Sequence, residues 1–261
     1  MRKRLVQMCV VLVLVMSMLA ATAGAETVRG DLSKRLGNLV EQYEYNGTKY
    51  NLRTRTSAVL ALAIDVNEHD LKLAEFARLL LVDDDQKIFA MLNIPANTLI
   101  QVADGEEEEL KYMRFGDVYQ MKGTPEENCQ RLLDAVNRLL GGNLVESYIA
   151  FDLEGATVLT GGVPVEGTTR EKLRTLQMIV DEMTTDELND TYALLGDYII
   201  TNMKSGAVMK IIDKADRYER QDTVELPGEQ RPTANNGPVV VADAQRLEEI
   251  KLSFFYKESA W

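Results

Sequence analysis

Two acidic residues stand at the ends of apolar runs that read as buried strands. Asp65 follows the run 57–64, and Glu75 comes directly before the run 76–82. Carboxylate oxygens are the ligands that a hard cation such as Mg²⁺ prefers, so these two residues are the candidate metal ligands. Strand ends are also commonly acidic and solvated, so spacing alone leaves a purely structural role open.

The remaining reactive residues form no catalytic set. Cys129 lies in an apolar helical pattern, which predicts a buried thiol. The single histidine, His69, lies in a polar stretch, and nothing in the sequence links it to Cys129, so Cys–His chemistry is unsupported. No GxGxxG, GxxxxGK[ST], HExxH, CxxC or GxSxG motif is present. The sequence therefore gives no support to nucleotide-binding loops, zinc sites or serine-hydrolase chemistry.

The elements that position the acids alternate between strands and helices, which predicts the α/β class. Apolar runs predict strands at 57–64, 76–82, 88–94 and 147–153, with a hairpin turn at 82–87. Helical spacing predicts helices at 124–140, 170–183, 185–201, 206–215 and 242–250. We expect a turn into a short strand at 161–165 and a surface loop at 228–237.

The N-terminus has the layout of an export signal. Arg2, Lys3 and Arg4 precede an apolar run from 5 to 21, and Ala23-Gly24-Ala25 supplies the small residues of a cleavage site. We predict that residues 1–25 are a signal peptide or an uncleaved membrane anchor, since a run of about 17 residues is near the lower limit for spanning a bilayer. Both alternatives export the remainder, either secreted or anchored at the outer face of the cytoplasmic membrane. Residues 26–50 are predicted to form a helical lead-in, and 51–261 one α/β domain.

Charge excludes some partners. The net charge is −12, and removal of the basic N-terminus would make the remainder more acidic still. Binding to nucleic acid or to anionic headgroups requires basic patches, so neither is expected of the domain. Contact with a membrane surface is expected only through an uncleaved N-terminus. We interpret the acidic run 106–109 as a solvated loop.

Several segments together resemble the LytR–CpsA–Psr (LCP) family of bacterial cell-envelope proteins over residues 52–257. The strongest stretches are ENCQRLLDAVNRLL at 127–140, VESYIAFDLEG at 145–155 and GGVPV at 161–165. Residues 201–203, 226–229 and 252–257 are similar to the family's C-terminal pieces. The resemblance implies a single LCP-like domain, with a central mixed sheet flanked by helices.

The resemblance also implies a chemistry. LCP proteins are phosphotransferases that move a glycopolymer from a polyprenyl-pyrophosphate carrier to peptidoglycan, with two acids holding Mg²⁺ and arginines clamping phosphate oxygens. The acids fall on Asp65 and on Glu75, where the family has Asp. The family's Arg-Asp-Thr signature falls on Ala96-Asn97-Thr98, so its arginine and its aspartate are absent. The family also has several arginines in the segment after its GGV-V turn. In this sequence only Arg170 and Arg174 remain to match them, so these two would be the catalytic candidates.

These departures predict a divergent LCP protein with weakened or lost catalysis, because each missing cationic donor can cost about 3 kcal/mol of barrier. The first alternative is an active, Mg²⁺-dependent ligase or pyrophosphatase that uses Asp65, Glu75 and Arg170. The second is an exported, non-catalytic module that binds a polyprenyl-phosphate lipid or a cell-wall glycopolymer. Whether the protein is an enzyme stays open at this point.

Overall fold

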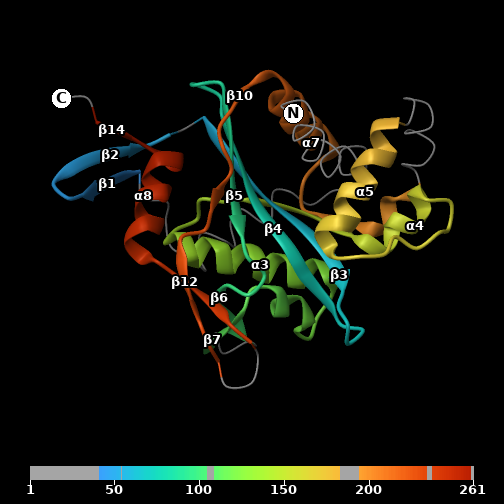
Figure 1. Cartoon of the computed structure of the whole chain (residues 1–261). Coiled ribbons are helices and arrows are strands. Elements are labelled where there is room, and N and C mark those ends of the chain that lie inside the picture. The colour runs from blue at the N-terminus through green and yellow to red at the C-terminus, as the bar shows by residue number, and fades with distance from the viewer. Residues whose placement is uncertain (1–40, 54, 105–108, 183–193, 234–236, 260–261) are drawn as a thin grey trace.

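The computed structural model of the chain describes residues 41–53, 55–104, 109–182, 194–233 and 237–259. Its centre is a mixed sheet with the strand order β10-β5-β4-β3-β8-β9, and β11 also pairs with β5 (Figure 1). The strands are β3 (Thr56–Val66), β4 (Lys72–Asp83), β5 (Ile88–Ile94), β8 (Ser147–Asp152), β9 (Ile199–Thr201), β10 (Glu219–Arg220) and β11 (Val224–Glu225). The predicted export segment, 1–25, lies outside the described residues.

The central strands form where the sequence has continuous apolar runs. β3 is buried from Ala58 to Asp65, because both faces of the sheet are covered. β4 and β5 are antiparallel, as the hairpin prediction requires. Their turn is closed by Asp83, whose Oδ1 accepts hydrogen bonds from the backbone N–H groups of Asp85 (2.9 Å) and Gln86 (3.0 Å).

Helices cover both faces of the sheet. One core packs α3 (Pro125–Leu140) and α8 (Ala244–Phe255) against one face. The other core packs α4 (Ala156–Leu159), α5 (Thr169–Glu182) and α7 (Ser205–Arg217) against the opposite face. Figure 1 shows α3 lying across the strands, with α8 on one side of the molecule and α4 and α5 on the other. The predicted α/β class with a central mixed sheet flanked by helices is confirmed.

Helix α3 shows why the local predictions succeeded. Thr124 caps its first turn, with Thr124 Oγ1 accepting from the N–H of Glu127 and the Glu127 carboxylate accepting from the N–H of Thr124. Gly141 ends the helix in the left-handed conformation, with φ of 74°. Cys129 is fully buried inside this helix, and burial raises the pKa of its thiol to about 12. The prediction of a buried cysteine is confirmed.

Small sheets and 3-10 turns complete the described fold. They are the sheet of β1 (Gln42–Tyr45), β2 (Thr48–Leu52) and β14 (Tyr256–Glu258); the pairs β6 (Leu99–Asp104) with β7 (Glu109–Arg114) and β12 (Gly228–Arg231) with β13 (Val239–Ala242); and the turns η1 (Gly116–Gln120), η2 (Leu153–Gly155) and η3 (Gly196–Tyr198). No helix in the described ranges is long and apolar enough to cross a bilayer.

The predicted helical lead-in is wrong over 41–50, the part of it that the structure describes. Asn46 and Gly47 both have positive φ (51° and 78°), which is the geometry of a tight hairpin turn, so β1 and β2 form a hairpin there. Tyr43 and Tyr45 alternate inward onto the core, and β2 pairs with β14 at the other end of the chain. Residues 26–40 lie outside the described residues.

Three further local predictions are wrong. Residues 228–231 form β12, because their backbone groups pair with β13, where we expected a loop. Residues 163–166 form no strand after the turn at Gly161. The predicted helix 185–201 falls outside the described residues up to 193, and its described end contains η3 and β9, because Ile199–Thr201 pair with β8.

Candidate functional site

A β-bulge brings the two candidate acids together. Along the β3–β4 ladder Ala63 lies opposite Phe76, but the next residue, Ile64, lies opposite Ala74. Glu75 is therefore an extra residue with no partner across the ladder, and a bulge of this kind re-aims its side chain. The Asp65 carboxylate acts electrostatically on Glu75, so the two acids that the sequence placed at strand ends lie near one another at one end of the sheet.

Asp65 is a buried carboxylate held by three donors. Its Oδ1 accepts from the backbone N–H of Val66 (2.9 Å) and from Lys172 Nζ (2.7 Å). Its Oδ2 accepts from Thr169 Oγ1 (2.7 Å). Both side-chain donors come from the first turn of α5, and the exposed fractions of the Asp65 and Lys172 side chains are only 6% and 18%. Asp65 is thus neutralised by a cation of the chain itself.

Glu75 has a different environment. Its side chain makes no hydrogen bond or ion pair with any residue that the structure describes, and it is partly buried. Burial raises its pKa, repulsion from the Asp65 carboxylate raises it further, and Asp117 adds to the effect. The guanidinium of Arg114 lowers this pKa in opposition. The raised pKa of Glu75 thus reflects its burial first and the nearby carboxylates of Asp65 and Asp117 second.

Arg114 is a site residue that the sequence did not reveal. Its Nε and Nη2 donate to Asp117 Oδ2 (2.7 Å) and Oδ1 (3.0 Å), and its pKa is raised mainly by this hydrogen bonding. The position of Arg114 is fixed by the backbone of the next residue, because the N–H of Phe115 donates to Thr98 O (2.8 Å).

Gly116 allows the close approach of this turn to β4. Its N–H donates to Ala96 O (2.8 Å), and an added Cβ would lie 3.2 Å from Ala74 O and 3.3 Å from the Ala96 side chain. Arg114 therefore stands two residues from a glycine that touches Ala96, the position where the resemblance implies an arginine. A guanidinium is present in this neighbourhood, but from another segment.

Lys72 adds a third cation at the same end of the sheet. β3 and β8 are parallel, and Ile64 lies opposite Asp152, so their carboxyl ends meet at one edge. Lys72 Nζ lies 2.7 Å from Asp152 Oδ2 and 2.7 Å from Glu154 Oε2. This lysine is thus already paired with two carboxylates, which leaves it little free charge for a ligand.

The structure does not bring Arg170 and Arg174 to the acids. Both side chains are exposed on α5. Successive helix residues turn by about 100°, so positions 170 and 174 share a face that lies about 160° around the helix from Lys172. Lys172 points at Asp65, and the two arginines therefore point away from it. Their predicted catalytic role has no support from this geometry.

The donor set around Asp65 does not fit a magnesium ion as the residues stand. Three donors already occupy its carboxylate oxygens, and one of them is a positive ammonium group. Among the described residues no group of three or more His, Cys, Asp or Glu side chains is arranged to hold a metal. The Glu75 carboxylate accepts no hydrogen bond from any side chain that the structure describes, so it is the one of the two candidate acids whose oxygens carry no donor.

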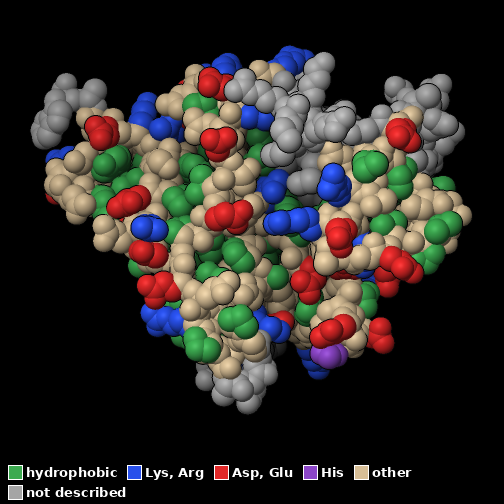
Figure 2. All heavy atoms as spheres, in the orientation of Figure 1, with side chains coloured by type: hydrophobic (Ala, Val, Ile, Leu, Met, Phe, Trp, Pro, Cys, Tyr) green, Lys and Arg blue, Asp and Glu red, His purple; other side chains and the backbone are tan. Residues whose placement is uncertain are grey.

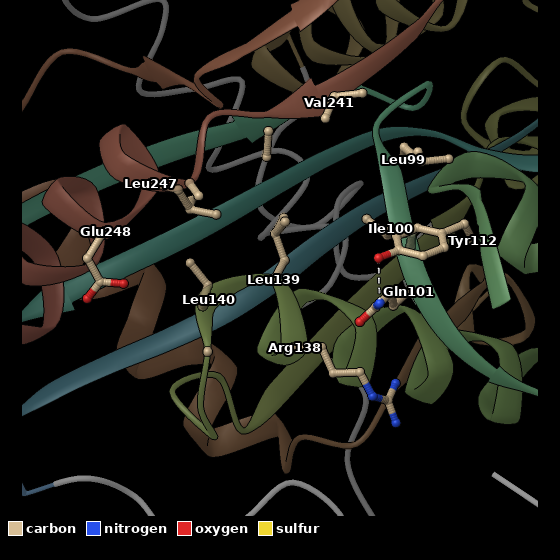
Figure 3. Close-up of a pocket in the computed structure, with 13 residues that line it drawn as sticks. Leu99, Ile100, Gln101, Tyr112, Arg138, Leu139, Leu140, Val241, Leu247 and Glu248 are labelled. Atoms are coloured by element: carbon tan, nitrogen blue, oxygen red, sulfur yellow. Dashed lines mark hydrogen bonds between the residues drawn. The ribbon is translucent and has the colours of Figure 1, made fainter. Parts of the chain in front are cut away.

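A pocket of about 350 Å³ opens between the C-terminal end of α3, the β6–β7 pair and the start of α8 (Figure 3). Leucines from these elements form much of its wall, and Gln101 Nε2 donates to the Tyr112 hydroxyl (2.6 Å) at one side. Arg138 and Glu248 lie at its edge, and Figure 3 shows the Arg138 side chain pointing away from the leucines. Leu99, a lining residue, is the cross-strand partner of Arg114. The pocket therefore reaches the strand pair that carries Arg114.

Charged side chains of both signs are distributed over the face of the molecule that Figure 2 shows, with hydrophobic side chains between them.

Comparison with known proteins gives the fold. TagT bound to LI-WTA aligns with a TM-score of 0.53 and 15% identity, over 82% of this chain and 95% of that one. TagV of B. subtilis aligns at 0.51 and 15%, over 78% and 97%, and protein gbs0355 of Streptococcus agalactiae at 0.53 and 11%, over 79% and 90%. No protein-family model and no curated protein sequence matches the chain. The alignments cover most of every chain, and the shared architecture is the LCP-like fold that the resemblance implies.

Proposed function

We propose that this LCP-like chain is a divergent cell-envelope protein that binds the diphosphate of a lipid-linked cell-wall glycopolymer, with weakened or lost transfer activity. One observation carries the proposal. Asp65, Glu75, Lys172 and Arg114 converge at one end of the sheet, inside the fold shared with TagT, which is described bound to LI-WTA. Cationic side chains held at the carboxyl ends of parallel strands are suited to phosphate recognition.

Weakened catalysis follows from the balance of charge. The transition state of phosphoryl transfer develops negative charge, which positioned cations must offset. Ala96 supplies no charge, Arg170 and Arg174 point away from Asp65, and Arg114 is already engaged by Asp117. Lys172, whose Nζ lies 2.7 Å from Asp65 Oδ1, is the cation best placed to contact a ligand at this site. Transfer at such a site would be slow, whereas binding requires less charge.

The apolar pocket supports a lipid-linked ligand. A polyprenyl chain is entirely apolar and is stabilised by roughly 25 cal/mol for each Å² of surface that leaves water. Leu99, Leu139, Leu140 and Leu247 offer such a surface beside the strand pair of Arg114. An exported location is part of the proposal, because the predicted export segment 1–25 would place the domain outside the cytoplasmic membrane.

The test is binding and turnover of a soluble prenyl diphosphate, geranyl pyrophosphate, with the purified chain in EDTA and in Mg²⁺. We expect calorimetric binding, weakened about tenfold or more by Asp65→Ala, and no release of phosphate in either condition. The matched control is Glu44→Ala, an exposed acid on β1 that should leave binding unchanged. Absence of binding in every condition would refute the proposed function.

An active enzyme is the second candidate, and Arg114 is the observation that favours it, because its guanidinium acts electrostatically on Glu75. That candidate predicts phosphate release from geranyl pyrophosphate that disappears in both Asp65→Ala and Arg114→Gln. Release that survives both substitutions comes from a contaminating phosphatase and counts against it. Arg170→Gln should reduce the rate only if the arginine moves to the site in the complex.

A further inference from the structure

The ion pair between Asp65 and Lys172 changes what the site requires of a ligand. A carboxylate has about four lone-pair positions, and three donors occupy three of those on Asp65, two on Oδ1 and one on Oδ2. A magnesium ion binds oxygen at about 2.0–2.1 Å and demands near-octahedral geometry. Such an ion on Oδ1 would stand beside the ammonium group that is 2.7 Å from the same oxygen. Two cations so close repel each other, so Lys172 and a metal compete for Asp65.

Lys172 is held where it stands by the packing of its helix. Its neighbours Leu173 and Leu176 are buried in the core between α5 and the sheet, with exposed fractions of 7% and 2%. Thr169, one turn earlier, donates to the other oxygen of Asp65. The helix is thus fixed to the acid at two points, and the lysine needs no rearrangement to present its charge.

The ammonium group retains capacity for a ligand. It carries three N–H donors, and its bond in this structure is to Asp65 Oδ1. The lysine side chain is 18% exposed, so it is not sealed from solvent at the end of the sheet where Glu75 and Arg114 interact. A phosphate oxygen approaching from solvent could accept the remaining N–H groups, as it does from lysines in other phosphate sites.

We propose that Lys172 takes the place of a divalent cation at Asp65, so that this chain binds a diphosphate without metal. The inference rests on the proposed function for its ligand class, and on the Asp65–Lys172–Thr169 geometry for its residue. Lys172 is then a binding residue that contacts a phosphate oxygen, and Asp65 is the residue that positions it.

The test compares geranyl pyrophosphate binding by calorimetry in EDTA and in Mg²⁺ for the wild type, Lys172→Gln, Lys172→Arg and the control Arg174→Gln. The wild-type affinity should differ by less than about threefold between the two conditions. In EDTA, Lys172→Gln should lose about tenfold or more, while Lys172→Arg and Arg174→Gln stay within about threefold. Circular dichroism and thermal melts show whether each variant is folded. The proposal is overturned if Mg²⁺ raises the wild-type affinity about tenfold or more and this increase depends on Asp65. It is also overturned if Lys172→Gln binds geranyl pyrophosphate normally in EDTA.

A second measurement separates this inference from the proposed function. Titration of free Mn²⁺, followed by its paramagnetic resonance signal, needs no diphosphate. We expect no Asp65-dependent Mn²⁺ site in the wild type, and a new one in Lys172→Gln that Asp65→Asn removes. A wild-type site that disappears in Asp65→Asn overturns the inference, and so does a Lys172→Gln protein without a new site. If geranyl pyrophosphate does not bind at all, the proposed function fails and this titration still decides the role of Lys172.

Discussion

The coupling between Asp65 and Lys172 can be measured as a free energy with a double-mutant cycle. The perturbations are Asp65→Asn, Lys172→Met and both together. At 2.7 Å the Coulomb attraction of two unit charges is about 6 kcal/mol at an effective dielectric constant of about 20. Desolvation of both groups offsets much of that attraction, and Lys172 keeps some contact with solvent. We therefore expect a coupling energy of about 2 kcal/mol.

The single variants should differ in a defined way. Lys172→Met leaves Asp65 buried with two donors, Val66 N–H and Thr169 Oγ1, and without a countercharge. Breaking a buried pair from one side costs about 3–5 kcal/mol, and the two remaining donors should bring the loss to the lower end of that range. Asp65→Asn removes the charge but keeps an acceptor, so we expect a smaller loss.

The assay is urea unfolding of the purified chain, followed by far-ultraviolet circular dichroism. The matched control is the cycle for Arg55 and Asp85, an ion pair at 3.2 Å whose side chains are 64% and 47% exposed. Exposed pairs contribute about 0.5 kcal/mol or less. A coupling energy for Asp65 and Lys172 no larger than that of the control pair would refute the reasoning, because the lysine would then be a solvated neighbour.

Three further predictions concern stability and reactivity. Cys129, whose pKa burial raises to about 12, should react with Ellman's reagent in the native protein only at the rate of unfolding, and at once in denaturant; rapid native labelling would contradict the buried position. Asn137→Ala should cost about 3 kcal/mol in urea unfolding, because the Asn137 side chain bonds the N–H and C=O of Val145 at 2.9 and 2.8 Å and is 1% exposed; a loss under 1 kcal/mol would contradict this. For Glu75 the folded pKa lies above the unfolded one, so its contribution to stability is present below the unfolded pKa and lost as pH rises through the folded pKa. Glu75→Gln should therefore stabilise the protein at pH 7 but not at pH 3, and equal effects at both would count against a raised pKa.

The parts of the fold that the sequence predicted are those fixed by local pattern. The central strands follow from apolar runs, and α3 follows from Thr124, Pro125 and Gly141, which are signals within a few residues of each end. The β1–β2 hairpin was missed because spacing of apolar residues before Tyr43 also fits a helix, while Asn46-Gly47 was the stronger signal for a turn.

The site was predictable only in its strand-borne half. Asp65 and Glu75 stand where strands end, which the sequence shows. Lys172 meets Asp65 across 107 residues, and which side of α5 would face the sheet depends on packing by Leu173 and Leu176. Arg114 acts on Glu75 electrostatically, and its position depends on the backbone hydrogen bonds of Phe115 and Gly116, which no pattern in the sequence indicates. Contacts of this kind depend on tertiary structure, so sequence reasoning assigned the missing charge to the arginines of α5.

Because Glu75 has no partner across the β3–β4 ladder, the hairpin of these two strands should tolerate its deletion. If Glu75 were deleted, Ala74 would join Phe76 directly, and both would keep their present partners and their present sides of the sheet. The β3–β4 ladder would then run without a bulge, and the residues on either side of the deletion would keep facing the same core as before. The hairpin is architecturally complete without this residue. A shortened chain should fold at least as well and differ mainly in lacking one negative charge, so the spare position can be gained or lost without rebuilding the domain.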